Sequence, residues 1–294
     1  MVFAAIDIGS NAVRLLFCNV YEKEPAPIIK KSSLIRVPIR LGEDVFKNGL
    51  ISDEKADRLV LAMQAFKKLM LVYNVVTFRA CATSAMREAV NGPQVVKRIK
   101  KEAEIDIEII KGDVEAEIIF STHLSDKFND KKSYLYIDVG GGSSEITLFS
   151  KNKKTASRSF NIGTIRMLQQ KDNKDEFNRM KKWIKVHTKD IKNTIAIGTG
   201  GNINKLSKLA NKKDIKNISI EKLMELDAYL NKFTYQERIE TLGLNPDRAD
   251  VIVQATAIFI AIMKTAGTKK IFIPQTGLSD GIINLLYKDF QKKK

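Results

Sequence analysis

Two short stretches of the sequence combine an aspartate with a glycine turn, and this combination could bind phosphate. Asp7 stands two residues before Gly9, and Asp138 stands two residues before Gly140. Glycine lets the backbone come close to a ligand and turn several N–H groups into one concavity, which suits phosphate oxygens. The aspartate cannot bind phosphate itself, but it can hold Mg²⁺ that bridges to the phosphate. The pattern therefore predicts a duplicated phosphate loop.

The repetition strengthens this interpretation. Each stretch stands at the start of an α/β block, and a third glycine loop follows at residues 198–201. A single glycine after a strand is most often only a turn, so three incidental turns are the alternative. Two such loops in corresponding places, together with the third, favour phosphate binding.

Segments of regular structure must position these loops. Apolar and β-branched residues predict strands at 2–8, 13–21, 28–39, 75–82, 107–111, 134–139, 145–149, 194–197 and 270–273. Periodicity and capping residues predict helices that begin near 53, 84, 93 and 113, a long helix over 248–266 and a last helix after Gly281. The chain is expected to turn helical directly after the strand at 145–149. This alternation predicts an α/β fold with one sheet in each half, and a polar stretch at 125–132 predicts the boundary.

The charge of the chain points to a polyanion. The 294 residues include 50 Lys and Arg against 34 Asp and Glu, a net charge of +16. Most of the excess lies after residue 120, where 32 basic and 18 acidic side chains give +14. However, 38 of the basic residues are lysines, which more often form solvated surface than bidentate phosphate contacts. Polyanion binding and background composition are both open at this point.

Composition excludes several classes of protein. No apolar run approaches the roughly 20 residues needed to span a bilayer, and the amino terminus lacks the pattern of a signal peptide. Cys18 and Cys81 lie far apart in apolar segments and are expected to be reduced core thiols. The two histidines share no ligand spacing with them, which argues against a zinc site. We therefore expect a cytoplasmic protein with no membrane partner.

Six motifs, in order along nearly the whole chain, resemble those of the exopolyphosphatase and guanosine pentaphosphate phosphohydrolase (Ppx/GppA) family. They lie at residues 7–15, 82–89, 110–116, 138–145, 198–201 and 247–250. This family is similar to actin, sugar kinases and heat-shock chaperone ATPases. The resemblance implies two actin-like (ribonuclease H-like) α/β domains with mixed sheets flanked by helices, and an active site in the interdomain cleft. The domains are expected at 1–124 and 125–294, with the last helix able to pack back on the first.

The resemblance also implies roles for single residues. Glu115 matches a catalytic glutamate that positions or deprotonates water, and Asp138 and Glu145 are expected to hold Mg²⁺ or Mn²⁺. Phosphate and substrate contacts are expected from Gly9, Ser10, Asn11, Arg14, Arg87, Gly141, Gly142, Ser143, Gly200, Gly201 and Arg248. Without the resemblance, Glu115 could equally be an ordinary acid in the first turn of a helix, and each arginine a surface cation. Arg14 is least suited to that alternative, because a charge amid apolar residues usually needs a partner.

The implied reaction removes the terminal phosphate of inorganic polyphosphate or the 5′-phosphate of guanosine pentaphosphate. Two other functions stay open: a superfamily kinase or ATPase that transfers a nucleotide phosphate to a small acceptor, and a non-enzymatic polyanion-binding protein. Nucleic acid is the less favoured polyanion, because Trp183 and its neighbours have the pattern of an amphipathic helix with a buried stripe. A homodimer is left open. Ala12, Asn202 and Gln254 depart from the family pattern, which puts substrate preference in doubt more than activity.

Overall fold

The computed structural model describes residues 1–24, 26–121, 132–151, 153–169, 174–189, 191, 194–210 and 216–292. The chain divides into two compact units, Met1–Thr122 with Leu278–Lys294, and His123–Gly277. The expected boundary between residues 124 and 125 lies outside the described residues. Each unit is built on one mixed β-sheet flanked by helices, which confirms the predicted α/β class.

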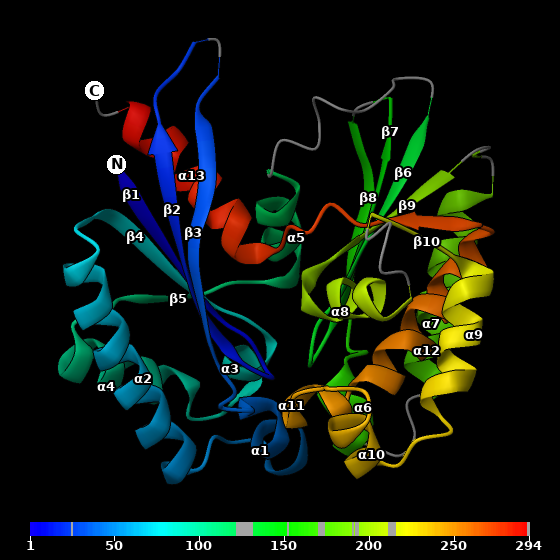
Figure 1. Cartoon of the computed structure of the whole chain (residues 1–294), viewed down its shortest axis with the longest axis horizontal. Helices are drawn as coiled ribbons and strands as arrows, with labels where there is room; N and C mark the ends of the chain where they lie inside the picture. The colour runs from blue at the N-terminus through cyan, green and yellow to red at the C-terminus, as the bar shows by residue number, and fades with distance from the viewer. Residues whose placement is uncertain are drawn as a thin grey trace. The chain divides into compact units, whose positions relative to one another are not determined.

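The first unit has a five-stranded sheet in the order β3-β2-β1-β4-β5 (Figure 1). The first three strands form an antiparallel meander; β4 then pairs with β1, and β5 with β4, both in parallel. The elements of this unit are β1 (Val2–Ile8), β2 (Val13–Tyr21), β3 (Ile28–Val37), α1 (Leu41–Asn48), α2 (Asp53–Val72), β4 (Val75–Ala82), α3 (Ser84–Glu88), α4 (Gly92–Ala103), β5 (Ile107–Ile109), α5 (Gly112–Phe120) and α13 (Leu278–Lys292).

Helices cover both faces of this sheet. Leu16 and Cys18 on β2 belong to an apolar core with α5 and α13. Phe17, which points to the opposite face, stacks on Tyr73 directly after α2, with the ring centroids 4.1 Å apart. Both cysteines are buried and form no disulfide, and burial raises the pKa of each thiol to about 12. This agrees with their prediction as reduced core thiols.

The second unit repeats this topology in a six-stranded sheet, in the order β10-β11-β9-β6-β7-β8. It again begins with an antiparallel meander, β6 to β8, and β9 and β11 then add in parallel. Its elements are β6 (Ser133–Val139), β7 (Ser144–Ser150), β8 (Lys153–Phe160), α6 (Thr164–Gln169), α7 (Lys174–Thr188), β9 (Thr194–Thr199), α8 (Gly200–Ala210), β10 (Asn217–Ser219), α9 (Ile220–Leu230), α10 (Tyr235–Glu240), α11 (Pro246–Ala249), α12 (Ile252–Ala266) and β11 (Lys270–Phe272).

Strand β8 was not predicted, because the chain was expected to turn helical after β7. The strand lies at the edge of the sheet and opens with exposed Lys153 and Lys154. Charged side chains on an edge strand discourage pairing with another chain, and they also remove the apolar alternation that reveals a strand.

The long helix predicted over 248–266 is interrupted, so the prediction is wrong in this respect. Helix α11 ends at Ala249, and α12 begins at Ile252. The Ala249 carbonyl accepts a hydrogen bond of 3.2 Å from the Arg238 guanidinium. A side chain of another helix therefore satisfies a carbonyl at the point where the helix is interrupted.

Among the described residues, one helical stretch, Pro246–Ala266, is long and apolar enough to cross a membrane by length and composition. This contradicts the expectation that no apolar run approaches that length. Half of its most apolar 18-residue window is buried, and α12 packs against α7, α8, α9 and β6 in the core of its unit. Such burial is typical of a core helix of a globular protein.

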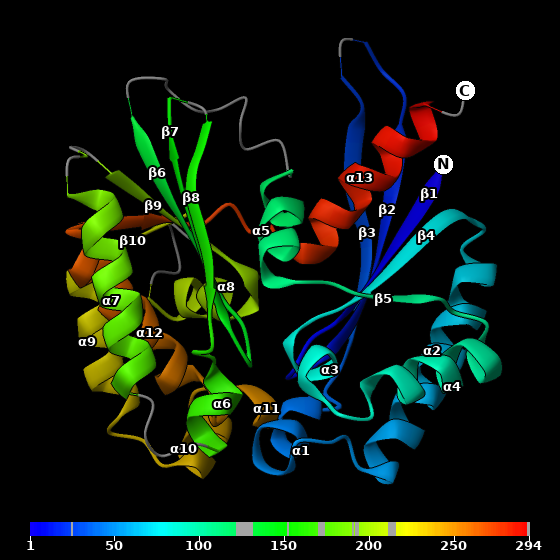
Figure 2. The ribbon, with the colours of Figure 1, turned by 180° about the vertical axis from the view of Figure 1, so that it is seen from behind.

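Helices α5 and α13 lie side by side in the first unit (Figure 2), and Gly281 marks the point of closest approach. A Cβ atom at this position would lie 1.9 Å from the carbonyl oxygen of Ile118 on α5. Next to this contact, Ser121 donates to the Gly281 carbonyl, and Asn284 donates to the Ser121 carbonyl. The helix that carries Glu115 is thus fixed by the carboxyl-terminal helix of the chain.

We expect Gly281→Ala to lower the free energy of unfolding by about 2–3 kcal/mol, because the two helices must separate. Urea denaturation measures this change, and the exposed Lys288→Ala on the same helix should stay within about 0.5 kcal/mol of the unmodified protein. Helix propensity alone predicts the opposite sign, a gain of about 1 kcal/mol. Such a gain would show that the close approach is not what requires glycine.

Candidate functional site

The first glycine loop connects β1 to β2. The Gly9 N–H donates to the Ala12 carbonyl at 3.2 Å and closes the turn. Ser10 is buried, and its Oγ lies 2.9 Å from Oγ of Ser84 at the start of α3. In the register of the two strands Asp7 faces Arg14, and the two side chains form an ion pair of 2.5 Å. Arg14 thus has the partner that its apolar surroundings predicted.

Backbone N–H groups at the entry of α1 bind two carbonyls of this loop from the same side. Arg40 N–H donates to the Asn11 carbonyl at 3.1 Å, and Gly42 N–H donates to the Ser10 carbonyl at 2.8 Å. Both donors lie where the chain enters α1, after the third strand of the meander. The C=O and the following N–H of a trans peptide point in opposite directions, so these bonds turn the N–H groups of Asn11 and Ala12 away from α1.

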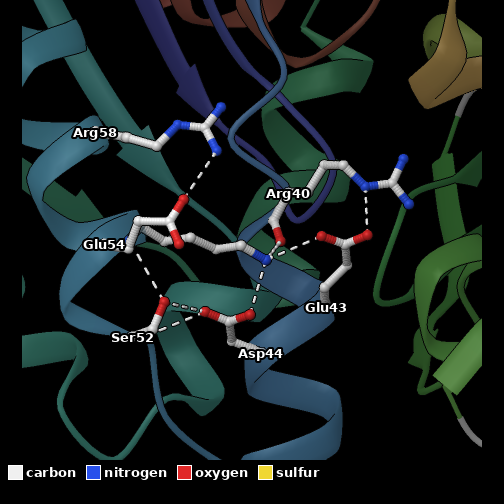
Figure 3. A network of polar contacts seen from close by, with 7 residues as sticks. Arg40, Glu43, Asp44, Ser52, Glu54 and Arg58 are labelled. Carbon is white, nitrogen blue, oxygen red and sulfur yellow. Dashed lines mark hydrogen bonds and ion pairs between the residues drawn. The ribbon is translucent and has the colours of Figure 1, made fainter.

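A charged network holds the donating segment in place (Figure 3). Arg40 adopts a left-handed conformation, φ 60°, which is uncommon for a residue other than glycine. Lys55 on α2 donates to its carbonyl at 2.8 Å and forms ion pairs with Glu43 at 3.0 Å and with Asp44 at 2.8 Å. Arg40 also pairs with Glu43 at 2.6 Å. The Lys55 ammonium therefore links the entry of α1 to α2.

The two acidic groups of this network are stabilised in their charged form. Burial alone would raise the pKa of Glu43, but hydrogen bonds from Lys55 and Arg40 lower it below its ordinary value. Burial acts in the same way on Asp44, and hydrogen bonds from Lys55 and Ser52 lower its pKa. Both carboxylates thus add stability to the folded state at neutral pH.

Arg87 and Glu115 lie on two other elements of the first unit. The Arg87 guanidinium donates to the Ile110 carbonyl at 2.7 Å, which fixes α3 to the segment that leads into α5. Glu115 lies in the first turn of α5, as predicted, and its side chain is partly buried. Burial is the main cause of the raised pKa of Cys81, and Asp7 and Glu115 add to it, so both carboxylates lie within electrostatic reach of that thiol.

The second glycine loop connects β6 to β7 and closes in the same way as the first. The Gly140 N–H donates to the Ser143 carbonyl at 2.9 Å. Asp138 faces Glu145 in the strand register, in the places that Asp7 and Arg14 occupy in the first unit. Glu145 is 4% exposed.

Hydroxyl groups surround these two carboxylates. Glu145 Oε1 accepts hydrogen bonds from Ser143 at 2.7 Å and from Ser159 at 2.8 Å. Asp138 Oδ2 accepts one from Thr199 at 3.1 Å. The side chains of facing residues in an antiparallel pair lie on the same side of the sheet, so two acidic groups are neighbours here.

This pair suits a hard divalent cation. Neighbouring carboxylates repel each other unless a proton or a cation lies between them, and Mg²⁺ is bound by one or two protein carboxylates together with phosphate oxygens and water. Among the described residues no group of three or more His, Cys, Asp and Glu side chains gathers as a metal site. The two neighbouring carboxylates are of the type and number that Mg²⁺ accepts from a protein.

The third glycine loop is a direct passage from β9 into α8. Gly200 has φ +87°, and a Cβ there would lie 2.6 Å from Oδ1 of Asp138. Glycine is thus required beside the acidic pair, and Gly201 follows in the first turn of α8. Arg248 donates to the Asn202 side chain, which donates in turn to the Val139 carbonyl at 2.8 Å. Asn202, the departure from the family pattern, therefore connects Arg248 to the residue before the second loop.

The predicted site residues thus form one set in each unit. The first set comprises Gly9, Ser10, Asn11, Arg14, Arg87 and Glu115, and the second comprises Asp138, Gly141, Gly142, Ser143, Glu145, Gly200, Gly201 and Arg248. Sequence reasoning missed Ser84, Ser159 and Thr199 as partners of these residues. The strand register would have indicated Thr199, whereas Ser159 lies on the strand that was not predicted.

Comparison with known proteins identifies similarity along almost the whole chain. The Ppx/GppA phosphatase family model matches residues 24–290. A bifunctional 3-dehydroquinate synthase/phosphatase of Fusobacterium nucleatum is 30% identical over 99% of the chain, which spans only 47% of that relative's length. Exopolyphosphatase 1 of Mycobacterium bovis is 24% identical, with 96% of this chain and 87% of the relative covered.

Solved structures show the same fold. The crystal structure of an exopolyphosphatase from Cytophaga hutchinsonii matches with a TM-score of 0.85 at 24% identity and covers 98% of each chain. A Ppx/GppA family member from Aquifex aeolicus matches with a TM-score of 0.77 at 20% identity, covering 99% of this chain and 98% of the other. The fold is the actin-like two-domain α/β fold that the resemblance implied.

We expect Lys55→Met to lower the free energy of unfolding by about 2 kcal/mol at pH 7, because two carboxylates and a carbonyl lose a charged donor. A lowered carboxyl pKa gives stability that is complete above the ordinary pKa values of 4.5 and 3.8 and disappears as the pH falls through the folded values. The difference between protein and variant should therefore shrink below about pH 4.

Chemical denaturation at pH 7, 5, 4 and 3.5 measures this difference. Lys100→Met is the matched control, because the Lys100 side chain is 63% exposed and pairs only on the surface with Asp106. A difference that stays constant down to pH 3.5 would contradict the assigned role of the two carboxylates.

Proposed function

Since the chain belongs to the Ppx/GppA phosphatase family, we propose that it is an exopolyphosphatase, which releases the terminal phosphate of inorganic polyphosphate. Guanosine pentaphosphate, hydrolysed at its 5′-phosphate, is the second substrate of the same proposal. We place polyphosphate before guanosine pentaphosphate because similar proteins are named exopolyphosphatases.

One observation carries the proposal: an acidic pair stands beside a glycine loop in which three successive N–H groups are available to a ligand. Asp138 and Glu145 face each other at the ends of β6 and β7. Within the described chain no hydrogen bond occupies the N–H groups of Gly141, Gly142 and Ser143. Such a loop suits the oxygens of a phosphoryl group, and the acidic pair suits the cation that accompanies it.

In the proposed reaction a water oxygen forms a bond to the terminal phosphorus, and the bond from that phosphorus to the bridging oxygen breaks. Glu115 orients the water and accepts its proton. The family resemblance assigns contacts with phosphoryl oxygens to the N–H groups of both glycine loops and to the guanidinium groups of Arg14, Arg87 and Arg248, and such contacts would stabilise the negative charge on those oxygens. Phosphoryl transfer depends mainly on positioning and electrostatic stabilisation, which is what fixed loops and arginines can supply.

Asp138 and Glu145 are the residues that would hold Mg²⁺ or Mn²⁺. When bound there, the cation would neutralise charge on the phosphate oxygens. The hydrogen bonds from Ser143, Ser159 and Thr199 orient the two carboxylates for this role.

The test is phosphate release from long-chain polyphosphate and from guanosine pentaphosphate, measured side by side with Mg²⁺. We expect turnover of polyphosphate, and we expect Glu115→Gln to lower kcat about 10²- to 10⁴-fold because the water loses its base. Glu117→Gln, an exposed position on the same helix, is the matched control and should keep full activity.

Three results would count against the proposal. Full activity of Glu115→Gln would show that Glu115 does not act as the base. ADP formation from ATP that depends on an acceptor would identify a kinase. Salt-sensitive retention of nucleic acid without any phosphatase activity would identify a polyanion-binding protein.

Metal dependence tests the acidic pair separately. We expect EDTA to abolish phosphate release and Mg²⁺ to restore it. Asp138→Asn should need about 10- to 100-fold more Mg²⁺ for half-maximal activity, because one ligand loses its charge. Asp113→Asn, an exposed acid at the start of α5, is the control and should need no more than the unmodified protein. An unchanged requirement in Asp138→Asn would place the cation elsewhere.

A further inference from the structure

The segment that follows β8 supports the second glycine loop through backbone hydrogen bonds. Thr164 N–H donates to the Gly140 carbonyl at 3.0 Å, and the N–H groups of Ile165 and Arg166 donate to the Gly141 carbonyl at 2.8 and 3.1 Å. Packing is so close that a Cβ at Gly163 would lie 2.4 Å from the Gly141 carbonyl oxygen. The loop therefore lies directly on the backbone of this segment.

Each of these bonds fixes the direction of one N–H group. A trans peptide is planar, and its C=O points opposite to the N–H of the next residue. Holding the Gly140 carbonyl against α6 turns the Gly141 N–H away from it, and holding the Gly141 carbonyl turns the Gly142 N–H away. The backbone of α6 thus aims two of the three N–H groups of the loop.

The third N–H group, that of Ser143, depends on a side chain. Arg166 Nε donates to the Gly142 carbonyl at 2.7 Å, and this bond is buried. The arginine itself is only 6% exposed. Gly142 has no side chain to restrict its backbone, so the 142–143 peptide has freedom to rotate when its carbonyl is released. In that case a carbonyl oxygen, instead of an N–H, could face the ligand side and repel a phosphate.

We propose that Arg166 is a positioning residue, which holds the Gly142 carbonyl and thereby aims the Ser143 N–H at an oxygen of the phosphoryl group. The inference rests on the proposed function for the identity of that group. Arg166 does not touch the substrate; it acts through the peptide between Gly142 and Ser143. Its guanidinium also places a buried positive charge next to the loop, which favours an anion there.

The experiment compares Arg166→Met, Arg166→Lys and Arg179→Met in two measurements. The first is kcat and KM for phosphate release from polyphosphate. The second is the shift of the Ser143 amide in ¹⁵N–¹H NMR spectra as inorganic phosphate is added, which needs no turnover. Arg179 is the control because its side chain, on α7 of the same unit, is 70% exposed.

Arg166→Met should lose about 100-fold, mainly in kcat, the usual cost of one misdirected oxyanion donor. Its Ser143 amide should need at least 10-fold more phosphate to shift. Arg166→Lys keeps a charged donor and should lose only about 10-fold, which makes it the informative variant if the methionine variant does not fold. Arg179→Met should match the unmodified protein in both measurements.

The outcomes separate the two proposals. If the protein hydrolyses polyphosphate but the Arg166 variants behave like Arg179→Met in both measurements, the inference is wrong and the proposed function stands. If the protein has no phosphatase activity but phosphate shifts the Ser143 amide only while Arg166 is present, the proposed function is wrong and the inference stands. Equal losses in Arg166→Lys and Arg166→Met that follow their melting temperatures would overturn the inference, because they would indicate a merely structural role.

Discussion

The planarity of the peptide unit is the constraint on which both glycine loops depend. When the carbonyls of a loop are held on one side, its N–H groups must face the other. In each unit the holding segment follows the third strand of the meander and enters a helix, α1 in the first and α6 in the second. The meander therefore has a second role besides forming the sheet: its third strand brings the chain back to the glycine loop between its first two strands.

The two units have the same strand register around their glycine loops, but the facing side chains carry different charges. In the first, Asp7 faces Arg14 and the two form an ion pair, whereas in the second Asp138 faces Glu145, so that two acidic residues lie opposite each other. The residue that closes each loop matches this difference. Ser143 has a hydroxyl that donates to Glu145, but the corresponding Ala12 has none, and an arginine in the facing strand needs no donor. The departure at Ala12 is thus consistent with the ion pair beside it.

The sequence predicted most strands, because apolar alternation depends on burial that is local to each strand. Strands β1, β2 and β4 begin and end at the predicted residues. Two features were missed because they depend on the position of a segment in the fold. Strand β8 has the polar composition of an edge strand, and the interruption of the helix after Ala249 involves Arg238 on another helix. In the candidate site, Arg14 was predictable from its apolar neighbours. Lys55 and Arg166 were not, because both bind main-chain carbonyls, and any residue type supplies a carbonyl.

The return of α13 to the first unit has a consequence for the order of folding during synthesis. Helix α5, with Glu115, leaves the ribosome before the whole of the second unit, and its partner helix is made only afterwards. At about 5–20 residues per second, this delay is on the order of ten seconds or more. During that time the apolar faces of β1, β2 and α5 have no cover from α13, so the nascent first unit exposes a hydrophobic surface until the last helix is made.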